Sequence, residues 1–132
     1  MYNGCIPKGW EDNTMQELMR ERLKEAGIDV TAALERFMGN ETLLERFLKK
    51  FLDDTNYEKL AAAIDAGQQE AALTAAHTLK GISGNLSMTG LFALLTEQVA
   101  AFRDNDWDRA VELMPEIAKH YETISAAIKT LA

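Results

Sequence analysis

Apolar residues recur at intervals of three and four along most of the chain, which is the spacing of one face of an α-helix. No stretch alternates between apolar and polar residues in the way that is typical of a strand. Asn13 and Asn40 are candidate N-caps, and Gly27 is a candidate stop. The pattern predicts helices over residues 13–26, 31–38, 41–66, 70–88, 89–104 and 107–131.

Three details of these helices follow from single residues. The segment 54–56 (Asp-Thr-Asn) weakens the middle of 41–66, which we expect to be one helix of roughly 39 Å, with a break as the alternative. Pro115 is expected to kink the last helix or to start its second part, because proline has no amide proton to donate. Thr89 or Ser87 is expected to be the N-cap of the helix over residues 89–104.

Four long amphipathic helices joined by short turns predict an all-α fold, an antiparallel up-down four-helix bundle. We expect residues 41–132 to form this core and residues 13–40 to add short N-terminal helices that cover one end of it. Residues 1–12 have no period and contain two glycines and a proline, so they are expected to be an irregular tail. At 132 residues, with 47% hydrophobic residues, the chain fits one domain over 13–132.

The charge of the chain excludes several kinds of partner. Its formal net charge of −7 argues against nucleic acid and against an anionic membrane surface, since both attract clustered lysine and arginine. A single cysteine, Cys5, forms no internal disulfide, and no cysteine or histidine cluster has the spacing of a metal site, so we expect no metal and no cofactor. No apolar run is long enough to cross a bilayer and no signal peptide is visible, which favours a cytoplasmic protein.

The predicted helix over 70–88 has a polar outer face with an unusual composition. Its inward stripe is Ala72, Ala75, Leu79, Ile82 and Leu86. Its outward residues are Glu70, Leu73, His77, Lys80, Gly81 and Gly84. Each glycine costs about 1 kcal/mol relative to alanine inside a helix. Because glycine has no Cβ, the two glycines are expected to bare the helix surface after His77, so that another molecule can approach the imidazole closely.

The run His77-Thr78-Leu79-Lys80-Gly81, with Ala75-Ala76 before it and Ser83, Gly84 and Leu86 after it, resembles a known motif. It is similar to the phosphorylation motif of histidine-containing phosphotransfer (HPt) domains of bacterial phosphorelays. The resemblance extends over roughly residues 29–131 in the number and order of the helices.

This resemblance implies a phosphoryl carrier and not an enzyme. His77 would be phosphorylated by an aspartyl phosphate of a receiver domain, whose own Mg²⁺ and lysine would supply the catalysis. Lys80 would stabilise the phosphoryl group and Gly81 would give steric access. The partners would be response-regulator receiver domains or a hybrid sensor histidine kinase, met by a monomer of this protein.

Further contact residues are expected around the histidine. Leu73 and Gly84 are expected to contact the partner. Gln98 lies on the following helix, where members of the family often place a side chain that bonds the active histidine. His120 has no such context and is expected to be a surface residue.

Other functions stay open at this point. A lone histidine is usually an ordinary surface or core residue, and only the neighbours of His77 favour a role. A helical adaptor that binds a receiver or a sensor kinase without passing phosphate is the alternative. A hydrolytic or metal-dependent enzyme has little support, because it would need paired carboxylates or ligand clusters around a pocket.

Overall fold

The computed structural model describes residues 8–131, and side chains from residue 17 onward. No strand occurs within these residues, so the predicted all-α class is confirmed. The described helices are α1 (Lys8–Glu25), α2 (Val30–Arg36), α3 (Glu41–Phe51), α4 (Asn56–Asp65), α5 (Gln69–Asn85), α6 (Thr89–Arg103), α7 (Trp107–Glu112) and α8 (Met114–Lys129).

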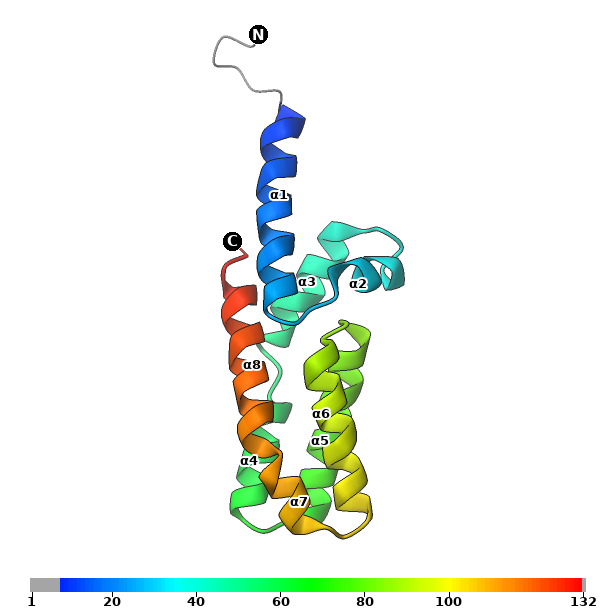
Figure 1. Ribbon diagram of the computed structural model, residues 1–132, viewed down its shortest axis with the longest axis vertical. Coiled ribbons are helices and arrows are strands. Elements are labelled where there is room, and N and C mark those ends of the chain that lie inside the picture. Colours follow the sequence, from blue (N-terminus) through cyan, green and yellow to red (C-terminus); the bar gives the residue numbers. More distant parts are fainter. Residues whose placement is uncertain (1–7, 132) are drawn as a thin grey trace.

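The helices from α3 onward run alternately down and up along the long axis of the molecule (Figure 1). The α3–α4 pair runs down, α5 up, α6 down and α8 up, with the short α7 at the lower end. The helix α5 packs against both α4 and α6, and α8 packs against α1, α3 and α6. The first half of α1 extends beyond the C-terminal end of α8 (Figure 1). This arrangement leaves one face of α5 uncovered between its two neighbours.

The segment 41–66 is two helices, so the prediction of one long helix is wrong and the alternative of a break is right. The carboxylate of Asp54 accepts hydrogen bonds from the backbone N–H of Asn56, at 3.0 Å, and from its side-chain amide, at 2.8 Å. Aspartate and asparagine offer the backbone such local bonds in place of helical ones. The break at residues 52–55 follows from this turn.

Several helix ends differ from the prediction. The helix α1 begins at Lys8, so Asn13 lies inside it and the prediction of an irregular tail is wrong for residues 8–12, whereas residues 1–7 lie outside the described residues. Asn40 caps α3 as predicted, since its side chain accepts from the Leu43 N–H at 3.0 Å. Pro115 lies in the first turn of α8, so it starts the second part of the last helical region instead of kinking it.

The helix α6 begins at Thr89, as predicted, but the prediction that Thr89 or Ser87 caps it is wrong. The residue at its N-cap is Met88, and no side chain caps the helix. Met88 is fully buried and forms a bridge with Ile28, and the N–H of Asp29 donates to the Ser87 carbonyl at 2.8 Å. Burial and backbone pairing therefore hold this turn, and they tie the α1–α2 connection to the end of the histidine-bearing helix.

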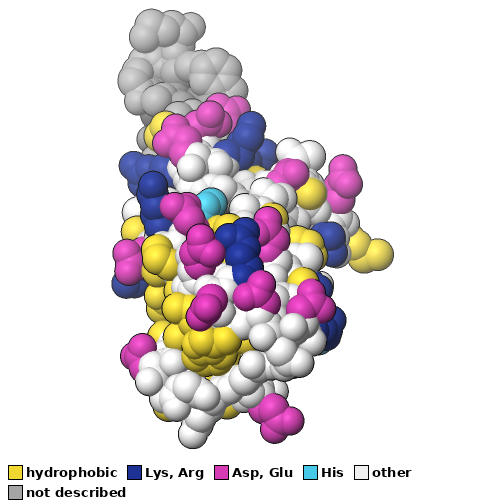
Figure 2. All heavy atoms as spheres, turned by 60° about the horizontal axis from the view of Figure 1, so that its bottom comes forward, with side chains coloured by type: hydrophobic (Ala, Val, Ile, Leu, Met, Phe, Trp, Pro, Cys, Tyr) yellow, Lys and Arg dark blue, Asp and Glu magenta, His cyan; other side chains and the backbone are white. Residues whose placement is uncertain are grey.

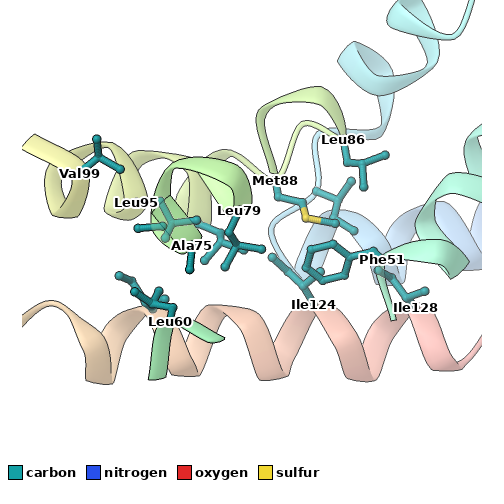
Figure 3. Packing of buried hydrophobic residues seen from close by; sticks show 14 of the residues in the cluster. Phe51, Leu60, Ala75, Leu79, Leu86, Met88, Leu95, Val99, Ile124 and Ile128 are labelled. Carbon is teal, nitrogen blue, oxygen red and sulfur yellow. The ribbon is translucent and has the colours of Figure 1, made fainter. Parts of the chain in front are cut away.

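The buried side chains of four helices fix the orientation of α5. Phe51, Leu79, Leu95 and Ile124 come from α3, α5, α6 and α8, and each is no more than 2% exposed. They converge in the space between these helices (Figure 3). Burial of one such side chain contributes about 1.5–3 kcal/mol, so α5 cannot rotate without losing a large part of the core energy.

A stack of two tyrosines joins α4 to α8. The ring centroids of Tyr57 and Tyr121 are 4.2 Å apart with nearly parallel planes. Burial raises the pKa of both phenols, with a further contribution to Tyr57 from Glu122 and to Tyr121 from Asp54 and Glu58. Both phenols therefore stay neutral at physiological pH and act as packing groups.

Candidate functional site

His77 lies on the uncovered face of α5. Its neighbours in the chain show how sharply the helix divides its faces, since Ala76 and Leu79 are fully buried whereas His77 and Thr78 are exposed. No hydrogen bond or ion pair joins His77 to any other side chain within residues 17–131. The imidazole is therefore open to solvent and to any partner that approaches this face.

Gly81 leaves the surface open one turn after His77. A Cβ placed on Gly81 would have no atom within 4 Å. The residue is exposed and lies in the interior of α5, where glycine is unfavourable by about 1 kcal/mol relative to alanine. Neither packing nor backbone conformation in the described part of the protein requires a glycine at this position.

Gly84 behaves differently from the prediction. A Cβ on Gly84 would lie 2.9 Å from Cε1 of Phe92, a residue of α6 that is 38% exposed. The missing side chain therefore admits the Phe92 ring, and the expectation that Gly84 bares the helix surface is wrong. Phe92 was not among the predicted site residues, although an aromatic residue on the outward side of the 89–104 pattern was a possible signal.

Lys80 lies beside this ring. The side chain is half-buried, and its ammonium nitrogen is 6.0 Å from the centroid of Phe92, within the range of a cation–π interaction. The lysine therefore leans toward α6 and not back over His77. Such a contact is worth about 0.5–1 kcal/mol at an exposed site, so the flexible lysine side chain can leave it for a stronger anionic partner.

The remaining predicted contacts lie deeper than expected. Leu73 is half-buried and packs against the hydrophobic core, so only part of it is available to a partner. Gln98 is fully buried and its amide donates to the Ala110 carbonyl at 2.9 Å. A side chain with no exposed surface cannot contact a partner, so we do not retain Gln98 as a contact residue. Its neighbour Glu97 is exposed and pairs with Arg109, with 3.0 Å between nitrogen and oxygen.

The second histidine of the chain has a packing role. His120 is half-buried, not a plain surface residue, and a Cβ on Gly90 would lie 2.7 Å from its Cε1. The glycine of α6 therefore makes room for this ring, much as Gly84 makes room for Phe92.

Acidic and basic side chains are interspersed over the face drawn in Figure 2, so the net negative charge forms no single block there. None of the described helices is both long and apolar enough to span a membrane.

The fold and the site together define a class of protein: an all-α bundle that presents one solvent-open histidine beside an open glycine. Residues 42–127, about two thirds of the chain, match the family model of the Hpt domain. The chain therefore belongs to the Hpt domain family, and the resemblance stated above is confirmed. A comparison with curated protein sequences and one with solved structures found no match.

Membership of this family places the protein in two-component phosphorelay signalling. Hpt domains are phosphocarriers rather than catalysts, and they interact with receiver domains and kinases. The matched segment contains His77, Lys80 and Gly81 and leaves α1 and α2 outside it.

Proposed function

We propose that this protein is a phosphoryl carrier, in which His77 accepts a phosphoryl group from the aspartate of one receiver domain and donates it to another. The observation that supports this most is the open histidine itself. In a chain of the Hpt family, His77 is exposed and the surface at Gly81, one turn away, has room for a second protein.

The proposed transfer is a single in-line displacement. The lone pair of Nε2 of the neutral imidazole attacks the phosphorus of the aspartyl phosphate. The N–P bond forms as the P–O bond to the aspartyl oxygen breaks, and the aspartate leaves as a carboxylate. The proton on Nδ1 of the resulting imidazolium passes to solvent. In the reverse direction the same atoms act in the opposite order.

His77 needs little help for this chemistry, because imidazole is a good nucleophile when neutral. The partner's Mg²⁺ and lysine would stabilise the charge on the transferring group. Lys80 would move from the Phe92 ring to the phosphoryl group, which carries roughly −1.5 to −2 charges if it resembles other phosphorylated side chains. Gly81 would let the rim of the receiver approach the imidazole.

The proposed contact with the receiver is small and transient. Its centre would be His77, Lys80 and Gly81, with the exposed part of Leu73 at its edge. Transient signalling contacts bury less than about 1,200 Å² in total. One copy of this chain is sufficient, so we propose that a monomer acts, in the cytoplasm where receiver domains are found.

The deciding experiment is phosphoryl transfer from a panel of receiver domains labelled on their aspartate. The wild-type protein is expected to take up an acid-labile, alkali-stable label, and His77→Ala to take up none. His120→Ala is the matched control, because the chain has two histidines, and it should be labelled like the wild type. The far-ultraviolet circular dichroism of His77→Ala should be unchanged, since the side chain is exposed.

A different result would support the adaptor. If receivers bind the wild-type protein but label neither it nor His120→Ala, the protein is a helical adaptor that does not pass phosphate. A label that persists in His77→Ala would place the acceptor elsewhere and overturn the proposal.

A further inference from the structure

A groove with a volume of about 660 Å³ lies between α2, α3 and α5. Its apolar lining includes the rings of Phe37 and Phe47, whose centroids are 5.3 Å apart, together with Phe51, Ile82 and Leu86. Phe47 is 41% exposed, so part of its ring is available to a partner. The α5 side of the groove consists of Ile82 and Asn85. The groove is therefore an apolar recess that is open to solvent and adjoins the histidine-bearing helix.

Two cations line the same groove. Neither Arg36 nor Lys50 has an ion pair with a described residue. The ammonium of Lys50 lies 5.4 Å from the centroid of the Phe47 ring. Asp54 also lines the groove, and the two hydrogen bonds that it accepts from Asn56 do not cancel its formal charge, so the lining has one formal positive charge in total. In a chain with a formal charge of −7, the groove is thus a local site for an anionic partner that carries an apolar group.

A row of residues on α5 leads from the histidine to this groove. His77, Gly81 and Asn85 follow one another at intervals of four residues, so they form a row that winds gradually around the helix surface. At 1.5 Å per residue, Asn85 is about 12 Å along the helix axis from His77. The row drifts by about 40° at each step, toward the side of α5 that faces α3. Gly81, in the middle of the row, has no side chain to obstruct a partner.

The near end of the groove lies at the edge of the area that a receiver centred on His77 would cover. A transient contact below about 1,200 Å² in total gives each partner about 600 Å², a disc about 14 Å in radius. A receiver centred on His77 therefore reaches the near end of the groove at Asn85. Arg36 and Phe37 lie outside the segment 42–127 that matches the family model.

We propose that the groove between α2, α3 and α5 is a second contact site for the receiver domain, and that it selects among receivers. It takes an apolar side chain of the receiver that is flanked by carboxylates, with the apolar side chain against Phe37 and Phe47 and the carboxylates beside Arg36 and Lys50. This inference rests on the proposed function, because the occupant is the receiver that meets His77.

The test uses the full chain and the receiver domain of the panel that binds the wild-type protein most tightly. The double variant Arg36→Glu/Lys50→Glu should raise the dissociation constant for the unphosphorylated receiver about tenfold, which is about 1.4 kcal/mol. In transfer from the labelled receiver it should raise KM about tenfold and leave the saturating rate unchanged, because the groove does not touch the reacting atoms. Phe47→Ala should raise the dissociation constant and KM about fivefold by removing the apolar contact.

The control variant is Lys119→Glu/Lys129→Glu, which changes the net charge by the same amount at two exposed positions of α8. Its dissociation constant and its KM should differ from those of the wild-type protein by less than a factor of two. Equal dissociation constants for the groove variant and this control would overturn the inference, whether or not the wild-type protein takes up label. Absence of label on the wild-type protein, in contrast, refutes the proposed function and leaves the binding test of the groove intact.

Sedimentation tests the other occupant, a second copy of this chain. Three results together would show that the groove holds a second copy and that the inference is wrong: the wild-type protein dimerises, the groove variant is monomeric, and the groove variant has the KM of the wild type. The expected result is the same sedimentation coefficient for both proteins.

Discussion

Gly81 and Gly84 lie less than one turn apart on α5, and the absence of a side chain has a different consequence at each. At Gly84 the ring of Phe92 occupies the space, so that a Cβ would come within 2.9 Å of it. At Gly81 a Cβ would meet nothing within 4 Å. Both glycines weaken the helix by about 1 kcal/mol, but only at Gly84 does packing offset this cost.

The difference shows that glycines in a helix do not by themselves mark a docking face. A glycine that faces an adjacent helix can be required for close packing, and Gly90 under the His120 ring is a second example. A glycine that faces solvent in the middle of a helix needs another explanation. At Gly81 the explanation we propose is access to His77, and the following predictions test it.

The largest effect is expected from Gly81→Glu. A carboxylate at this position would project into the space that the receiver needs and would repel its phosphoryl group, so the rate of transfer at limiting concentration should fall at least about 100-fold, or about 2.7 kcal/mol. Ala126→Glu, at an exposed position of α8, is the matched control and should transfer at the wild-type rate. Equal rates for the two variants would show that the open surface at Gly81 is not used.

Lys80→Ala should have the next largest effect. Loss of the ammonium that we expect to meet the phosphoryl group should lower the saturating rate of transfer about tenfold, or about 1.4 kcal/mol. The melting temperature should change little, because the contact of Lys80 with Phe92 is weak. Lys80→Arg keeps the charge and should recover most of the rate.

Phe92→Ala separates the two possible roles of Lys80. It removes the ring over which the lysine lies in the free protein but leaves the lysine in place. Transfer by Phe92→Ala close to the wild-type rate, together with a slow Lys80→Ala, would support a direct role of the ammonium. A similar loss of rate in both variants would instead indicate that the ring itself is part of the contact.

Much of the fold could be predicted from the sequence, because burial imposes a clear period. The apolar spacing predicted the all-α class, and side-chain chemistry predicted the cap at Asn40 and, as one of two alternatives, the new start at Pro115. One helix over residues 41–66 was preferred to a break because apolar spacing continues across residues 52–55, whereas a local turn of Asp54 decides the backbone there. The turn between α5 and α6 ends at Met88, where the backbone pairs with Ile28, sixty residues away, and no local pattern reveals this pairing.

The site was predicted unevenly for the same reason. The outward position of His77 follows from the helical period and agrees with its exposure. The period cannot tell which outward residues an adjacent helix covers, so Gly84 and Gln98 were both misplaced. Their environment depends on how closely α6 approaches α5 and α7. The functional roles of His77, Lys80, Gly81 and Leu73 remain predictions.

The smallest predicted effect tests the comparison of the two glycines most directly. Gly81→Ala should raise the free energy of unfolding by about 1 kcal/mol, because alanine favours the helix and its methyl group meets no other atom. Gly84→Ala should bring no such gain, because the new methyl group must displace the Phe92 ring. Urea denaturation of the single variants measures both values.

A double-mutant cycle then isolates the ring as the cause. In a Phe92→Ala background the space beside Gly84 is empty, so Gly84→Ala should now stabilise the protein by about 1 kcal/mol, as Gly81→Ala does in the wild type. Gly81→Ala should have the same effect in both backgrounds and serves as the internal control. If Gly84→Ala is equally stabilising with and without Phe92, the ring does not require this glycine, and the two positions would have to be explained alike, as parts of one open face beside His77.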